Sequence, residues 1–121
     1  MATLRLRLLF DDAMLGPGKA ELLGHIRDTG SIAAAGRQMD MSYKRAWMLV
    51  EEMNTAYREP LVISTRGGPG GGGAQLTEIG ATVLGLYHDI VATAQAAAAT
   101  DIAALEALLR PVSRSDISEG K

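Results

Sequence analysis

The chain has 121 residues, 47% of them hydrophobic and 21% charged, which is the size and composition of one ordinary globular domain. We expect no second domain in this length, and a sequence without cysteine excludes disulfides, thiolate metal ligands and a cysteine nucleophile. The net charge of −2, from 12 basic and 14 acidic residues, taken globally argues against a nucleic-acid binder, which is usually basic. Residues 37–66 nevertheless hold five basic and four acidic residues, so a local basic face is available.

Neither a signal peptide nor a membrane span is visible in the sequence. Arg5 and Arg7 interrupt the leucines near the start, where a signal peptide needs an uninterrupted apolar stretch. The longest apolar region, residues 79–99, contains His88 and Asp89 and is not the run of about 20 apolar residues that a membrane span needs. We therefore expect a soluble cytoplasmic protein with no membrane partner.

The first predicted elements are a strand and a helix. Leucine alternates with arginine in residues 3–10, which is the period of two expected of a strand with one buried face. Gly16-Pro17-Gly18 then breaks the chain. Apolar residues recur at helical spacing from there until Thr29-Gly30 stops the helix, namely Ala20, Leu22, Leu23 and Ile26.

Two short helices follow, and each begins after a serine that can cap it. Ser31 predicts a helix over 32–38, and Ser42 predicts one over 43–54 after a turn of three residues. The second helix has a core stripe made by Ala46, Leu49, Val50 and Met53. Polar and mixed residues lie off that stripe, namely Tyr43, Lys44, Arg45 and Met48. We interpret Trp47 as a core residue at the junction of the two helices.

A hairpin and a long helix complete the predicted elements. Residues 61–63 and 74–76 read as strands that pair across a glycine-rich tip, and Thr77 caps a helix that continues or restarts as far as Arg110. Pro111 ends this helix, and the tail to residue 121 is expected to be flexible.

Two short helices joined by a tight turn, followed by a hairpin, are typical of a winged helix-turn-helix, whose second helix enters the major groove of DNA. The expected fold class is mainly α with a small β wing. We divide the chain into a winged helix-turn-helix core over 1–76, a long dimerisation helix over 77–110, and a flexible tail over 111–121.

Several motifs resemble one regulator family. Residues 30–47 read GSIAAAGRQMDMSYKRAW, residues 52–54 read EMN, residues 67–73 are glycine-rich, and residues 76–80 read LTEIG. Together with the opening LRLRL and GPGK segments, they resemble the N-terminal DNA-binding domain of the ModE family of molybdate-responsive transcriptional regulators over residues 3 to about 90. The wider LysR-type regulators share only the looser Gly-Ser, Ser and Leu-Thr-x-x-Gly positions.

The resemblance implies a sequence-specific DNA-binding regulator linked to molybdenum-related genes, with double-stranded DNA as its partner. Family members continue into a C-terminal sensor that binds molybdate, and we expect no such sensor, no molybdate site and no cofactor in this chain. Gly36 stands where related sequences often have alanine, which costs about 1 kcal/mol of helix propensity unless close helix packing requires glycine.

The predicted DNA contacts lie on the recognition helix 43–54 and on a glycine-rich wing over 66–73 that reaches the backbone or the minor groove. The candidate DNA-binding residues are Ser31, Arg37, Ser42, Tyr43, Lys44, Arg45, Met48 and Arg66. A homodimer is expected because the long helix carries more apolar residues than one small core can cover. The candidate dimerisation residues are Leu86, Ile90, Val91, Ala94, Ile102 and Leu105.

Other functions are less favoured by the sequence. The glycine run lacks the Gly-Lys-Ser/Thr ending of a phosphate-binding loop, and no arrangement of residues suggests a catalytic site or an enzyme. His25 and His88, with Glu21 and Asp89 nearby in sequence, favour surface or packing roles over a metal site. The main alternative is a dimeric helical module that binds another protein and does not read DNA. A second alternative is that the alanine-rich segment folds back on its own domain.

Overall fold

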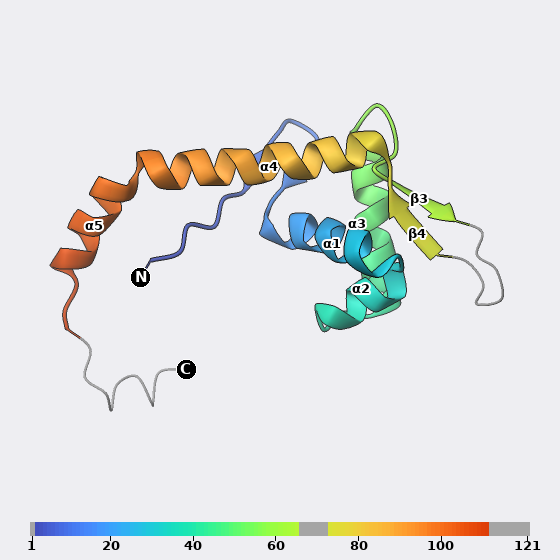
Figure 1. Cartoon of the computed structure of the whole chain (residues 1–121), viewed down its shortest axis with the longest axis horizontal. Helices are drawn as coiled ribbons and strands as arrows, with labels where there is room; N and C mark the ends of the chain where they lie inside the picture. Colours follow the sequence, from blue (N-terminus) through green and yellow to red (C-terminus); the bar gives the residue numbers. More distant parts are fainter. Residues whose placement is uncertain (1, 66–72, 112–121) are drawn as a thin grey trace.

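The computed structural model describes residues 2–65 and 73–111 (Figure 1). Two short hairpins and five helices follow one another along this part of the chain. Their bounds are β1 Leu8–Leu9, β2 Met14–Leu15, α1 Pro17–Thr29, α2 Ile32–Gln38, α3 Tyr43–Ala56, β3 Val62–Thr65, β4 Gly73–Leu76, α4 Glu78–Ala97 and α5 Ala99–Leu108. The fold is thus mainly helical with a small β3–β4 hairpin, as predicted, and it has a second two-stranded sheet, β1–β2, that was not predicted.

The hydrophobic core lies where α1, α3, the β3–β4 hairpin and the first half of α4 meet. Leu22, Leu23 and Ile26 of α1 are fully buried, as the helical spacing predicts. The other elements bury a second set of side chains around them, made up of Val50, Met53, Leu61, Val62, Val83, Leu84 and Tyr87. This core occupies one end of α4, and the rest of that helix extends away from it (Figure 1).

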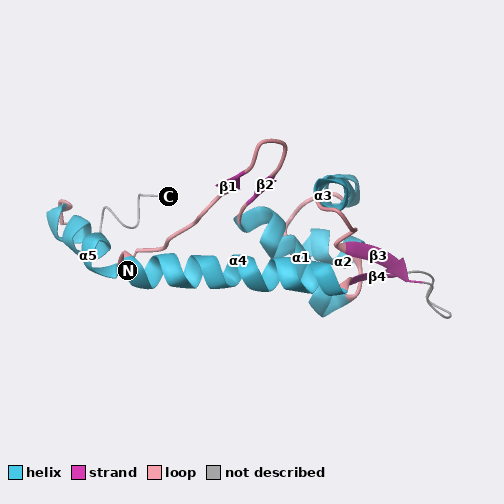
Figure 2. Cartoon of the chain, turned by 90° about the horizontal axis from the view of Figure 1, so that it is seen from above, coloured by secondary structure: helices cyan, strands magenta, loops and turns pink. Residues whose placement is uncertain are grey.

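The predicted strand over 3–10 is wrong for most of its length. Only Leu8 and Leu9 pair with another strand, because β2 supplies just two partner residues. The alternation itself is real, since the leucines at 4, 6 and 8 are half-buried and the arginines between them are exposed. The segment instead lies alongside α4 (Figure 2), where the Tyr87 hydroxyl donates a hydrogen bond of 2.6 Å to the Leu6 carbonyl. The alternation of leucine and arginine in this segment therefore reflects packing against helix α4 and does not mark a strand.

The turn between α2 and α3 is tight because small residues meet there. A Cβ on Gly36 would lie 3.1 Å from the Cβ of Ala46 and 3.3 Å from the Met41 carbonyl oxygen. Glycine at position 36 therefore allows α2 and α3 to pack closely, which offsets its unfavourable helix propensity. Asp40 completes the turn in the left-handed region at φ 56°, a conformation that aspartate tolerates better than most residues.

Serine caps fix the start of each helix in this pair. The Ser31 hydroxyl accepts the backbone N–H of Ala34 at 3.0 Å, and the Ser42 hydroxyl accepts that of Arg45 at 3.1 Å. Both predicted caps are therefore confirmed. Each cap satisfies a donor that the first turn of a helix leaves unpaired, so the helix begins at a defined residue.

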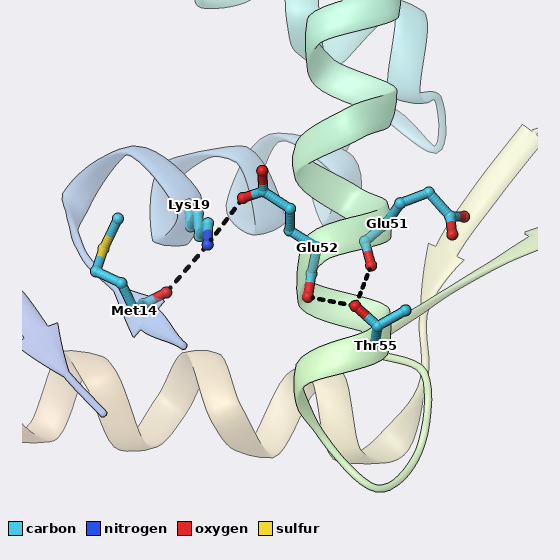
Figure 3. A network of polar contacts seen from close by, with 5 residues as sticks. All are labelled: Met14, Lys19, Glu51, Glu52 and Thr55. Atoms are coloured by element: carbon cyan, nitrogen blue, oxygen red, sulfur yellow. Dashed lines mark hydrogen bonds and ion pairs between the residues drawn. The ribbon is translucent and has the colours of Figure 1, made fainter. Parts of the chain in front are cut away.

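A lysine connects α1 to α3 and β2 (Figure 3). Lys19 Nζ donates to the Met14 carbonyl at 3.2 Å and lies 3.2 Å from a carboxylate oxygen of Glu52. The Lys19 side chain is only 11% exposed, whereas that of Glu52 is 57% exposed. In the last turn of α3 the Thr55 hydroxyl donates to the carbonyls of Glu51 and Glu52. The Lys19–Glu52 ion pair links α3 to the first turn of α1, whereas the Thr55 hydrogen bonds stay within α3.

The β3–β4 hairpin is attached to the helices at both of its strands. β3 pairs antiparallel with β4 from Val62 opposite Leu76 to Thr65 opposite Gly73, which confirms the predicted hairpin. Asn54 of α3 accepts the N–H groups of Leu61 and Val62 and donates to the Val62 carbonyl. On the other strand, the N–H of Ala74 donates to the carbonyl of Gly30 at 2.9 Å. The direction of the hairpin is therefore fixed relative to α1 and α3.

The predicted long C-terminal helix is two helices that meet at Ala98. The Thr77 hydroxyl caps α4 by accepting the N–H of Gly80 at 2.9 Å. α5 begins at Ala99 and turns away from the axis of α4 (Figure 1), with Asp101 in its first turn, where a negative charge is favourable. The chain restarts a helix here, which is one of the two expected outcomes. Among residues 2–65 and 73–111, none of the helices has both the length and the hydrophobicity that a membrane span requires.

Candidate nucleic-acid interface

The outer face of α3 presents the residues that the sequence placed off the core stripe. Ala46, Val50 and Met53 are buried and Leu49 is half-buried, so the predicted stripe is confirmed. The side chains of Tyr43, Lys44, Arg45 and Met48 are all exposed. Two positive charges therefore lie in the first turn of a capped, well-supported helix.

The prediction that Trp47 is a core residue is wrong, because its side chain is 45% exposed. Gly36 and Ala46 already bring α2 and α3 too close for an indole ring to fit between them. The ring instead lies on the outer face of α3, one helical turn after Tyr43. We therefore add Trp47 to the residues of the candidate interface.

A groove follows the side of α3 that faces the β3–β4 hairpin. Its lining combines aromatic rings with hydroxyl groups and comes from α2 and its N-cap, α3 and both strands, namely Ser31, Ile32, Ala33, Tyr43, Trp47, Ser64, Thr65, Gly73 and Ala74. Ser64 and Thr65 were not among the predicted site residues, and they lie on β3 after the apolar residues that predicted the strand. Hydroxyl donors beside an exposed helix face are suited to hydrogen-bond phosphate oxygens.

A second groove lies on the opposite side of α3, between that helix and the start of α1. Arg7 and Arg45 both line it, and both are exposed. The aliphatic part of Arg7 lies over Gly16, where an added Cβ would come within 2.9 Å of the arginine Cγ. Arg7 is 38 positions away from Arg45 in the sequence, so only the fold reveals that the two positive charges share one groove.

The acidic residues of α3 limit the interface to its first two turns. Glu51 and Glu52 are exposed in the third turn, and Glu52 is paired with Lys19. Negative charge at this point repels the phosphate backbone of a nucleic acid. The favourable part of α3 is therefore the segment from Tyr43 to Met48.

The remaining predicted DNA-binding residues are not gathered at one place. The capping hydroxyls of Ser31 and Ser42 already accept backbone N–H groups, and of the two only Ser31 lines a groove described above. Arg37 is exposed in the last turn of α2 and lines neither groove. Arg66 lies outside the described residues, as do residues 66–72 of the wing predicted over 66–73 and residues 112–121 of the tail predicted over 111–121.

The predicted dimerisation residues fall on more than one face. Leu86 and Ile90 of α4 and Leu105 of α5 are exposed by 56%, 41% and 65%. Val91 instead packs partly against the core and, with Leu4, lines a pocket beneath the N-terminal segment. Ala94 and Ile102 are half-buried. The single apolar stripe that the sequence suggested is therefore divided, and only part of it is open.

The two histidines lie on different helices and differ in exposure. His25 is half-buried on α1, whereas His88 is exposed on α4. Across residues 2–65 and 73–111, no three His, Asp or Glu side chains lie close enough together to hold a metal ion.

Comparison with known proteins found similarity to regulators, although no protein-family model matches the chain. The chain is 41% identical over 102 residues to the transcriptional regulator ModE of Yersinia pestis, which covers 81% of this chain and 38% of that protein. It is 39% identical over 103 residues to the DNA-binding transcriptional dual regulator ModE of Escherichia coli K12, covering 81% and 39%. It is also 42% identical over 80 residues to the molybdenum-pterin-binding protein MopB of Rhodobacter capsulatus, covering 66% and 30%. The chain thus spans no more than about two fifths of the length of these relatives.

Proposed function

We propose that this chain is a sequence-specific DNA-binding transcriptional regulator of the ModE family. Two independent lines support the proposal. Relatives that are named as transcriptional regulators match four fifths of the chain at about 40% identity. The single structural observation that carries it is the exposed, positively charged first turn of α3, flanked by a groove on each side.

In this proposal the fold is a winged helix-turn-helix and α3 is the recognition helix in the major groove. Ser42, Tyr43, Lys44 and Arg45 begin the helix, which is where recognition helices of this class contact base edges. Arg45 is suited to form paired hydrogen bonds with a guanine, and Lys44 to contact a phosphate. The hairpin, including the expected contact from Arg66, would follow the backbone next to the groove.

The residues that line the two grooves would contact the DNA backbone on either side of α3. On the hairpin side, Ser64 and Thr65 offer hydroxyl groups beside Tyr43. On the other side, Arg7 adds a charge to that of Arg45. Contacts of this kind position a protein on the duplex and make its affinity fall as salt rises, because each neutralised phosphate releases counterions.

A homodimer completes the proposal. Leu86 and Ile90 form an exposed apolar surface on α4, and Leu105 is exposed on α5. A second copy of the chain would cover this apolar area. A two-fold pair would present two copies of α3 to half-sites separated by one or more turns of the DNA. This geometry predicts an operator with inverted symmetry.

The link to molybdenum rests on the names of the relatives alone. They include regulators named ModE, a molybdenum transport protein named ModE from Azotobacter vinelandii and the molybdenum-pterin-binding protein MopB. We propose that the genes regulated by this chain serve molybdenum metabolism, and we assign it no catalytic role.

Selection of binding sites from random duplex DNA tests the proposal directly. We expect enrichment of a symmetric sequence, together with an affinity that falls steeply as salt rises. The double variant Lys44→Ala/Arg45→Ala should lose most of this binding. Its matched control is Arg58→Ala/Arg110→Ala, which removes the same charge from exposed residues that line neither groove. Failure to enrich any sequence would favour the alternative, a dimeric module that binds another protein.

A further inference from the structure

Two consecutive large apolar residues of α3, Trp47 and Met48, are exposed and belong to no part of the core. Trp47 and Met48 are each 45% exposed, although the buried side of the same helix is fully apolar. Each follows a residue of the first turn by four positions, Trp47 after Tyr43 and Met48 after Lys44. Residues four apart lie on one face of a helix, so these two side chains continue the proposed DNA-facing surface into the second turn.

The major groove of DNA offers only one apolar group to such side chains. Its base edges carry hydrogen-bond donors and acceptors for every base pair, and thymine adds the C5-methyl group. A phosphate contact is disfavoured in this turn, because the exposed Glu51 follows Met48 by three positions on the same face. The side chains of Trp47 and Met48 therefore fit thymine methyl groups better than they fit phosphate. The backbone contacts beside Trp47 are left to the hydroxyls of Ser64 and Thr65 in the hairpin-side groove.

We propose that Trp47 and Met48 read thymine methyl groups, so that the DNA site of this protein contains thymines opposite the second turn of α3. The inference rests on the proposed function and specifies the substrate within it. Lys44 and Arg45 would then supply affinity and hydrogen-bonded readout, while the two apolar residues separate thymine from uracil and from cytosine.

Replacement of thymine by uracil tests the inference, because it removes only the methyl group and leaves all hydrogen bonds of the base pair. The probes are two preparations of the DNA selected from a random pool, one made with thymidine and one with deoxyuridine triphosphate. We expect the chain to bind the uracil preparation more weakly, by about fourfold for each methyl group that it contacts.

Variants of α3 assign that difference to these residues. Trp47→Ala/Met48→Ala should bring the ratio of the two affinities close to one, and Met48→Ala alone should lower it. Both side chains are half exposed, so their truncation leaves the core intact, which circular dichroism and thermal unfolding verify. The matched control Lys44→Ala should weaken binding to both preparations and leave their ratio unchanged.

The possible failures are distinct. Equal binding of the thymine and uracil preparations by the unchanged protein would overturn the inference and leave the proposed function standing. The inference would also be overturned if Trp47→Ala/Met48→Ala kept the same ratio of affinities for the two preparations as the unchanged protein. If neither preparation binds, the proposed function itself fails, and the inference fails with it.

Discussion

Gly80, in the first turn of α4, lies so close to Leu61 that a Cβ on residue 80 would overlap the Leu61 carbonyl oxygen. That oxygen also accepts the backbone N–H of Thr77 at 2.9 Å, and the N–H of Leu61 donates to Asn54 at 2.8 Å. The end of α3, the start of the hairpin and the start of α4 are therefore held together through a few backbone atoms.

Gly80→Ala is expected to destabilise the fold by about 1 to 3 kcal/mol or more, because neither the helix nor the anchored carbonyl can move aside without strain. Urea unfolding measures the loss. The matched control is Gly85→Ala in the same helix, where an added Cβ meets nothing within 4 Å. That variant should gain about 1 kcal/mol from helix propensity. A stable Gly80→Ala protein would contradict the close approach.

Asn54→Ala is expected to destabilise the protein by about 2 to 4 kcal/mol. It removes three hydrogen bonds of the side chain and leaves the N–H groups of Leu61 and Val62 without their partner. Hydrogen exchange should show faster exchange at those two N–H groups, while Ala35 in α2 keeps its protection. Asn54→Asp retains the acceptor but faces the Val62 carbonyl without a donor, so its stability should be intermediate.

Tyr87→Phe is expected to cost about 1 kcal/mol near neutral pH, since it removes the hydrogen bond to the Leu6 carbonyl. Burial raises the pKa of the Tyr87 hydroxyl above its ordinary value of 10.0. The charge of Arg5 lowers this pKa and the charge of Glu21 raises it, and both effects are smaller than that of burial. The protonated form is thus favoured in the folded state. The stability difference between the two proteins should stay constant below about pH 10 and shrink as pH rises through the folded pKa, as unfolding at several pH values will show.

Much of this fold could be predicted because local signals and tertiary packing agree. Serines at 31 and 42 cap helices in the structure as their position before apolar runs predicts, and Gly30 ends α1 in the left-handed conformation. The alternating pattern of residues 3–10 predicted a strand wrongly, because most of this segment packs against helix α4 and not against another strand. The core position predicted for Trp47 is also wrong, because the distance between α2 and α3 depends on the small residues at 36 and 46 together.

The candidate interface could be predicted only in part for a similar reason. Residues of α3 follow from helical spacing within one segment. Arg7, Ser64 and Thr65 come from segments far away in the sequence, and nothing local distinguishes them from ordinary surface residues. Their role as groove-lining residues depends on how the chain brings those segments beside α3.

Arg45→Ala is expected to weaken binding to the selected DNA site by about 1 to 3 kcal/mol and to relax specificity at one base pair. Arg7→Ala should instead weaken binding to all sequences alike and reduce the salt slope by about one unit, because we assign Arg7 to a phosphate. Titrations at several salt concentrations with specific and random duplexes separate the two effects. Loss of specificity in the Arg7 variant would reverse these assignments.

Leu86→Glu/Ile90→Glu is expected to convert the proposed homodimer to a monomer, because it places charge on the exposed apolar surface of α4. Light scattering at micromolar concentration gives the mass, and binding to a symmetric DNA site should weaken with it. The control Ala96→Glu changes an exposed residue elsewhere on α4 and should leave the mass unchanged. An unchanged protein that scatters as a monomer would end the dimer proposal.

The position of the N-terminal segment affects how the protein can be labelled. Ala2 lies in the angle between α4 and α5, where it lines a pocket with Gln95, Ala99 and Ile102. An affinity tag fused before this residue would be placed between α4 and α5, where its bulk would compete with a second copy. Assembly should therefore be measured on tag-free material. A small fluorophore at residue 2, paired with one on α5, would report changes in the angle between the two helices.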